Sequence, residues 1–298
     1  AVSGMAKDLN KMSAKSSIKL LVPGDAHGKL YQWVALLTGS KNALKGAGFF
    51  LGGAMLTVLG FRGAVGVMAI ALALVWLFSL VMLKKDLGKA QNKPKFSEIF
   101  SKSRAINYLS AARMCLFGAR DVWFVVALPV YMVASLGWDH QAVGGFMALW
   151  VIGYGVVQAF APTITGKRSG KVPAGKAAFL WASVLAFVPA LIAIGMLNNA
   201  NPQWVLLGGL MIFGAVFAIN SSLHSYLIVS YANEDGVSLD VGFYYMANAM
   251  GRLIGTVLSG WLYQVSGLEA CLWVSTGFVA LAALISILLP KHPVLAVH

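Results

Sequence analysis

Long apolar runs recur along almost the whole chain, and they constrain its fold more than any other feature. A helix needs about 20 mostly apolar residues to cross a bilayer. Only 11% of the residues are charged, whereas soluble domains average about 25%. None of the runs shows the two-residue alternation of a membrane β-strand. The sequence therefore predicts an all-α protein that crosses a membrane several times.

Eight segments are long and apolar enough to be membrane-spanning helices. A basic, polar connection separates the first two from the last six, and six spans behind a long loop are typical of the second half of a six-plus-six transporter. We therefore predict the end of an N-terminal half at 1–83, a central cytoplasmic loop at 84–105 and a six-helix C-terminal half at 106–298. The eight segments are 31–60, 63–83, 106–135, 141–163, 177–197, 203–231, 241–266 and 269–290.

The start of the chain resembles an internal loop. It opens with Ala1 and continues with a polar, basic segment from Lys7 to Lys29 that has no signal-peptide pattern. We expect further sequence upstream, so that the eight spans are part of a set of twelve. The alternative is a protein with eight spans.

The net charge of +13 gathers in loops on one side of the predicted membrane domain. Basic residues occupy the opening segment, the loops 84–105 and 164–176 and the C-terminal tail, whereas the opposite side carries Arg62 alone. Cytoplasmic loops of membrane proteins carry such an excess of Lys and Arg. The basic side is therefore predicted to be cytoplasmic, and the charge does not indicate nucleic-acid binding.

No motif in the sequence indicates an enzyme or a cofactor. The chain has no P-loop, no HExxH and no nucleophile elbow. Cys115 and Cys271 lie in apolar segments without the spacing of a metal site or of a disulfide framework. We expect no catalysis, no cofactor, no bound metal and no ATP-driven transport by this chain.

Five basic residues and one acid lie inside the predicted spans. Each costs roughly 2.5–3.5 kcal/mol at the bilayer centre on insertion scales, so all must face protein, water or a ligand. Lys45, Arg120 and Arg252 lie roughly 16–21 Å from the cytoplasmic start of their spans, near mid-membrane. The sequence therefore predicts one cavity with an excess of positive charge. The six residues are Lys41, Lys45, Arg113, Arg120, Arg252 and Asp121.

Helical spacing places these cations on shared faces. Lys41 and Lys45 are four residues apart, and Arg113 and Arg120 are seven apart. The planar fork of arginine suits phosphate-like oxyanions. We predict that Lys45 and Arg120 hold an anion and that Lys41 and Arg113 guide it from the cytoplasm. The alternative for Lys41 and Arg113 is that both reach back to lipid headgroups.

The seventh span adds a third polar face. Tyr245, Asn248 and Arg252 follow the i, i+3, i+7 pattern of one helix stripe. We predict that this stripe completes the substrate site. On the fourth span, Trp150, Tyr154 and Gln158 form a similar stripe, which is either a cavity wall or ordinary packing. The predicted substrate-binding residues are Lys45, Arg120, Arg252, Lys41, Arg113, Asn248 and Tyr245.

Asp121 and His224 are the residues suited to proton coupling. A carboxylate among intramembrane cations is either an ion-pair partner or a proton carrier. Because neighbours in sequence do not face each other on a helix, we expect Asp121 to pair with Lys45 or Arg252 rather than with Arg120. His224 is either a titrating site or a hydrogen-bonded packing residue.

Four runs resemble the major facilitator superfamily, and more closely its ArsJ-type branch of organoarsenical efflux permeases. They are residues 37–46, 48–53, 100–107 and 117–129, of which Gly-Ala-Arg-Asp-Val-Trp at 118–123 is the most specific. The run 48–53 resembles the antiporter motif of the fifth helix, although Phe49 replaces its proline. The resemblance implies a major-facilitator-type bundle in which the eight spans are helices five to twelve.

The resemblance also implies a function. ArsJ-type permeases of the bacterial inner membrane are taken to export 1-arseno-3-phosphoglycerate, which forms when glyceraldehyde-3-phosphate dehydrogenase uses arsenate instead of phosphate. Export by such a secondary active transporter gives arsenate resistance and links the permease functionally to that enzyme. The nearest alternative is a transporter of another organophosphate or organic anion. A different class is a membrane receptor or scaffold, against which the buried cations argue.

Overall fold

The computed structural model describes residues 27–82, 103–165, 173–198, 201–232 and 237–290, together with Ala14, Ser17, Ile18 and Val22. Every regular element in these ranges is a helix, so the prediction of an all-α protein is confirmed there. Nearly all of the predicted central loop 84–105, and most of the basic loops that set the orientation, lie outside the described residues. The helices are α2 (His27–Met82), α3 (Arg104–Phe124), α4 (Ala127–Ala134), α5 (His140–Thr165), α6 (Gly175–Leu197), α7 (Pro202–Tyr231) and α8 (Val237–Ser286).

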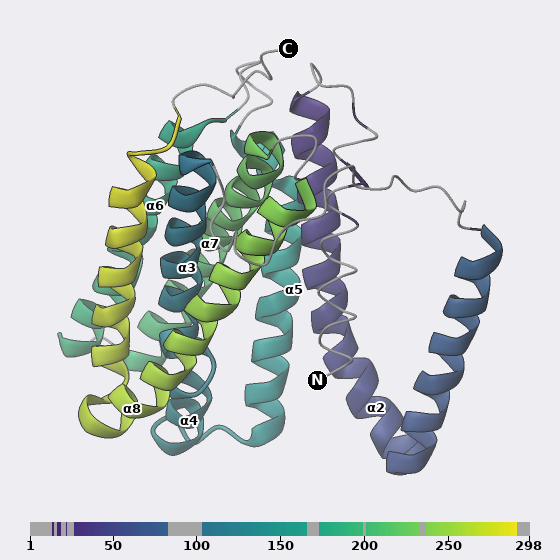
Figure 1. Ribbon diagram of the computed structural model, residues 1–298. Coiled ribbons are helices and arrows are strands. Elements are labelled where there is room, and N and C mark those ends of the chain that lie inside the picture. The colour runs from purple at the N-terminus through teal and green to yellow at the C-terminus, as the bar shows by residue number, and fades with distance from the viewer. Residues whose placement is uncertain are drawn as a thin grey trace.

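The predicted number of helices is wrong, because the described residues form seven helices and not eight. The chain reverses direction at Gly60 and Gly267 (Figure 1), where φ is 66° and 76°. Glycine adopts positive φ without a steric penalty, so helix continues up to the turn on both sides. The first two predicted spans therefore merge into α2, and the last two merge into α8.

The third predicted span is divided. At Val126 the backbone leaves the helical region, with φ −121°, and this break separates α3 from α4. In the part of the chain that the structure describes, six stretches are long and apolar enough to cross a membrane. Together with the glycine turns, the break at Val126 accounts for the difference between the expected and the observed helices.

The two arms of α2 have different surroundings. The first arm packs beside α5, whereas the second arm stands apart from the other helices (Figure 1). Nearly all side chains from Val58 to Met82 are exposed and apolar. An apolar helix of this kind is compatible with a lipid environment but not with water.

Small residues bring the helices around the core into close contact. On α8, a Cβ at Gly251 would overlap the Met114 carbonyl oxygen of α3, and one at Gly255 would lie 2.6 Å from the Gly118 carbonyl oxygen. This is the close approach that glycines four residues apart allow between membrane helices. By contrast, a Cβ at Gly260 would meet nothing within 4 Å. The α3–α8 pair therefore packs backbone against backbone at the level of the intramembrane charges.

Candidate binding cavity

A cavity of about 720 Å³ lies among α2, α3, α5, α7 and α8. Ligand pockets of proteins usually measure about 300–1,000 Å³. Of the described residues that line it, five are basic and none is acidic. All seven residues predicted to bind substrate line this one cavity: Lys41, Lys45, Arg113, Arg120, Tyr245, Asn248 and Arg252. The structure therefore brings together residues that lie up to 211 positions apart in the sequence.

Arg113 is buried at the inner wall of the cavity, with 4% of its surface exposed. Its Nε donates to the Asn248 side-chain oxygen at 3.1 Å, and one Nη donates to both the carbonyl and the hydroxyl oxygen of Ser221, each at 3.1 Å. No carboxylate among the described residues contacts it. Arg113 therefore points into the bundle and does not reach for headgroups, and its hydrogen-bond acceptors among the described residues are neutral.

Asp121 lies behind the cavity wall, fully buried, and binds two arginines. Its Oδ2 accepts from Nε of Arg252 at 2.8 Å, which is one of the expected pairings. Its Oδ1 accepts from Nε of Arg120 at 2.6 Å, which is a pairing that we did not expect. The expectation was wrong because the long Arg120 side chain folds back along α3 to reach its neighbour. The carboxylate thus fixes arginines from α3 and α8 at one edge of the cavity.

Phe117 lies between the two arginines of α3. The guanidinium carbon of Arg113 is 3.9 Å from the centre of the Phe117 ring, and that of Arg120 is 4.9 Å from the same centre. Both distances are within the range of cation–π attraction. The ring is 7% exposed and lines the cavity. A single aromatic side chain therefore contacts both cationic groups.

A chain of hydrogen bonds ties the cavity wall to α2. Asn42 donates to the Gln158 side-chain oxygen at 2.6 Å, and Gln158 donates to the Ser221 hydroxyl at 3.1 Å. That hydroxyl is also an acceptor of Arg113. Helices α2, α5, α7 and α3 are thereby linked through side chains. Sequence reasoning gave no site role to Asn42 or Ser221, although both are polar residues inside apolar runs.

The stripe on α5 has a mixed role. Tyr154 lines the cavity, and Gln158 is fully buried in the hydrogen-bond chain behind it. Trp150 instead donates its ring N–H to the Leu210 carbonyl at 2.9 Å and packs on Trp123 and Phe124. The stripe is therefore a cavity wall at one end and core packing at the other.

The Lys41 and Lys45 side chains lie on the face of α2 that lines the cavity, and both residues are exposed. His224 on α7 is fully buried and does not line the cavity, although its neighbour Ser225 does. Neither ring nitrogen of His224 has a hydrogen-bond partner among the described residues. Both interpretations of His224, as a titrating site and as a hydrogen-bonded packing residue, stay predictions.

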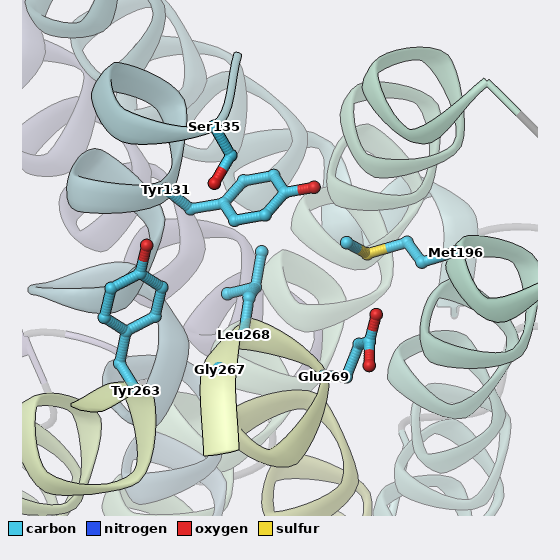
Figure 2. Close-up of a pocket in the computed structure, with 7 residues that line it drawn as sticks. All are labelled: Tyr131, Ser135, Met196, Tyr263, Gly267, Leu268 and Glu269. Carbon is cyan, nitrogen blue, oxygen red and sulfur yellow. The ribbon is translucent and has the colours of Figure 1, made fainter. Parts of the chain in front are cut away.

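A second, smaller cavity of about 310 Å³ lies beside the glycine turn of α8 (Figure 2). Tyr131, Ser135, Tyr263 and Glu269 give it four polar side chains. Figure 2 shows the hydroxyl groups of Tyr131 and Tyr263 and the carboxylate of Glu269 pointing in different directions. None of the residues predicted from the sequence lies there, so the cationic cavity is the candidate site.

A bundle of apolar helices with a polar cavity between them is an arrangement found in secondary transporters. The chain belongs to the Major Facilitator Superfamily, whose family model matches residues 1–238 and 109–297. The family predicted from the sequence is thereby confirmed, and it is a family of membrane transporters rather than of enzymes. The narrower ArsJ-type branch stays a prediction.

A solved structure supports the fold. The crystal structure of a bacterial homologue of the iron transporter ferroportin in the outward-facing state matches with a TM-score of 0.70. The match covers 94% of this chain and 68% of that one, with 16% sequence identity, a level at which the likeness concerns the fold alone. No protein with a curated description matches the sequence.

Proposed function

We propose that this chain belongs to a secondary active transporter that exports 1-arseno-3-phosphoglycerate and so protects a bacterium from arsenate. The observation that supports this proposal is the lining of the large cavity, with five basic residues and no acidic one among those described. A cavity with this charge attracts anions and repels cations. The cargo carries a carboxylate, a phosphate and an arsenate group, so its charge complements the lining.

Arg113 gives the strongest argument for an anionic ligand. A charged side chain inside a membrane costs roughly 2.5–3.5 kcal/mol on insertion scales. Among the described residues, neutral acceptors bind Nε and one Nη of Arg113, and no carboxylate pairs with its charge. An oxyanion in the cavity supplies the missing countercharge. Arginine also binds such groups through two parallel hydrogen bonds, which fixes their orientation.

The remaining site residues take complementary roles in this proposal. Lys45, Arg120 and Arg252 hold the anionic groups, with Asn248 and Tyr245 as neutral hydrogen-bonding partners. Lys41 and Arg113 receive the cargo from the side of the inner membrane that the sequence predicts to be cytoplasmic. Asp121 balances the charge of the two arginines that it binds. Asp121 and His224 are also the candidates for carrying a coupling proton during alternating access.

The proposal is tested in arsenate-sensitive bacteria that express the complete gene with and without glyceraldehyde-3-phosphate dehydrogenase. Cellular arsenic is measured after an arsenate challenge. We expect arsenic to fall only when both proteins are present, because the enzyme makes the cargo. A fall with the permease alone would point to inorganic arsenate as the cargo. No change, with the protein present in the membrane, would refute the arsenical function.

Two matched variants connect the assay to the cavity. Arg113→Gln removes the buried charge but keeps hydrogen-bonding capacity, and it should abolish the fall in arsenic. Arg62→Gln removes an exposed charge outside the cavity and should leave export unchanged. Equal export by the two variants, at equal amounts in the membrane, would show that the cationic cavity is not the transport site.

A further inference from the structure

A buried tyrosine holds the beginning of α2 against α5 and α7. Tyr31 is 2% exposed, and its hydroxyl oxygen lies 3.0 Å from the hydroxyl oxygen of Thr165 at the end of α5. Because the Thr165 hydroxyl donates its proton to the Ala161 carbonyl at 2.8 Å, Tyr31 is the donor in this pair. The Tyr31 ring also packs on Tyr226 of α7, with 4.9 Å between the ring centres. One side chain of α2 therefore contacts two other helices.

Apolar packing surrounds this contact. Leu30, Val34 and Ala35 of α2 are buried together with Ala161 of α5 and Leu223 of α7 in one hydrophobic cluster. Tyr31 belongs to the same cluster. The first turns of α2 are thus packed into the bundle, and they cannot leave it without exposing this apolar surface.

The Tyr31 contact lies at one end of the cavity. The part of α2 that lines the cavity begins at Leu37, which is about 9 Å of helix beyond Tyr31. On α7, Tyr226 directly follows Ser225, which lines the cavity. Thr165 is the last residue of α5, where the chain enters the basic loop that the sequence predicts to be cytoplasmic. The contact therefore lies between the cavity and the predicted cytoplasmic ends of these helices.

Helices α2 and α5 also cross closely beside the cavity. A Cβ at Gly39 of α2 would lie 2.5 Å from the Gly155 carbonyl oxygen of α5, and one at Gly155 would overlap the backbone nitrogen of Ala43. Backbones in such close contact are a feature of tightly packed membrane helices. The Tyr31 end of α2 lies roughly 12 Å of helix from this crossing. A tilt of α2 about the crossing therefore moves Tyr31 away from α5 and α7.

We propose that Tyr31 closes a cytoplasmic gate: its contacts with Thr165 and Tyr226 hold α2 against α5 and α7 and shut the cavity on that side, and they break when α2 tilts to admit cargo. Lids and gates of this kind are held by a few contacts at the end of a moving element. The inference rests on the proposed function only in requiring a cavity that opens to each side in turn. It does not depend on which anion is carried.

Labelling of a cysteine in the cavity tests the gate without any cargo. Thr38→Cys places one thiol in the cavity lining of the complete protein, in which all natural cysteines, Cys115 and Cys271 among them, are replaced by alanine. A membrane-impermeant maleimide is added to inside-out membrane vesicles, where it reaches the protein from the cytoplasmic side alone. We expect slow labelling while Tyr31 is present, because the gate shields the thiol from this side.

Variants of Tyr31 should open the gate by different amounts. Tyr31→Phe loses the hydrogen bond and keeps the ring, so labelling should become about two- to tenfold faster. Tyr31→Ala loses both contacts and should be faster by about tenfold or more. Gln32→Ala, an exposed neighbour on α2, is the control and should leave the rate unchanged. An unchanged rate in Tyr31→Phe would overturn the proposal, and this variant decides alone if Tyr31→Ala does not fold.

Labelling from the opposite side distinguishes a gate from general loosening. The same reagent is added to intact cells, where it reaches the protein from outside the cytoplasmic membrane. If the cavity opens to one side at a time, Tyr31→Phe should slow this labelling or leave it unchanged. Faster labelling from both sides would mean that Tyr31 only stabilises the fold, and would contradict the gate.

The outcomes also separate this inference from the proposed function. If arsenic export requires the dehydrogenase but Tyr31 variants label like the natural protein, the transport function stands and the gate is refuted. If labelling responds to Tyr31 as expected while no arsenic is exported, the gate stands and the arsenical cargo is refuted.

Discussion

Asp121 binds both Arg120 and Arg252, and replacing it by asparagine should change stability and anion binding in opposite directions. Asparagine is nearly the same size, so Asp121→Asn removes a charge and leaves little cavity. The carboxylate is fully buried, the Arg120 side chain is 14% exposed and the Arg252 side chain is 46% exposed. The two ion pairs therefore contribute very differently, and their sum sets the expected size of the effect.

Most of the stability lost in Asp121→Asn should come from breaking the ion pair with Arg120. Breaking a buried ion pair by removing one partner costs about 3–5 kcal/mol, because the other charge is left without compensation. The pair with Arg252 is half exposed and contributes about 1 kcal/mol or less. Water in the cavity hydrates part of the Arg120 charge, so we expect the lower end of the range. The free energy of unfolding should fall by about 3–4 kcal/mol.

Anion binding should improve in the same variant. Removing the carboxylate raises the net positive charge next to the cavity by one unit, and this attracts an oxyanion more strongly. Thermal unfolding of the purified protein, with and without inorganic phosphate, reports both effects. We expect a lower melting temperature without phosphate and a larger upward shift when phosphate is added. Asp139→Asn, an exposed acid at the start of α5, is the control and should change neither.

Two results would refute this reasoning. The first is a variant as stable as the natural protein, which would mean that the buried carboxylate is not charged or not needed. The second is a smaller shift on adding phosphate, which would mean that Asp121 assists the anion rather than competing with it. A double variant that also carries Arg120→Gln should regain part of the stability, because removing both partners of a buried pair costs less than removing one.

Two further predictions concern packing and hydrogen bonding around the cavity. Gly251→Ala should destabilise the protein by about 1–3 kcal/mol, because the added Cβ overlaps the Met114 carbonyl of α3. The control Gly260→Ala should cost little stability, because nothing lies within 4 Å of the new atom. Equal melting temperatures of the two variants would contradict the close packing of α3 and α8. Gln158→Leu should cost about 1–3 kcal/mol, because the half-buried Asn42 loses its acceptor and the buried Ser221 hydroxyl loses one of its two donors. Transport should weaken as well, because Gln158 links Asn42 to the Ser221 hydroxyl that accepts from Arg113. A Gln158→Leu protein with full stability and full transport activity would show that the hydrogen-bond chain is dispensable.

The sequence predicted the apolar spans and the grouping of the intramembrane cations well, for one physical reason. Charges such as Arg113 and Arg252 are too costly in lipid, so they must face a common interior, and helical periodicity tells which faces those are. Side-chain conformations do not follow from periodicity. The contact of Arg120 with its neighbour Asp121 depends on the rotamer of a long flexible side chain, which the spacing of residues along a helix does not predict.

Neutral residues of the site were harder to find. Asn42 and Gln158 cost less than charges inside a membrane, so their presence does not by itself demand a functional explanation. Phe117 is one aromatic residue among many in apolar runs, and only the positions of two guanidinium groups on its ring distinguish it. The merging of spans at Gly60 and Gly267 likewise depends on backbone angles that the apolar pattern does not reveal.

The tight turn at Gly267 has a mechanical consequence for transport. Because no loop separates the two arms of α8, and both arms contact α3, we expect the arm that carries Arg252 and the arm that follows it to move together. Helices α3 and α8, which carry Arg113, Arg120 and Arg252, are thus expected to behave as one rigid unit. Lys41 and Lys45 belong to α2, which is linked to this unit through the hydrogen bonds of Gln158 with Asn42 and Ser221. Motion of α2 relative to this unit would therefore have to break the hydrogen bonds of Gln158.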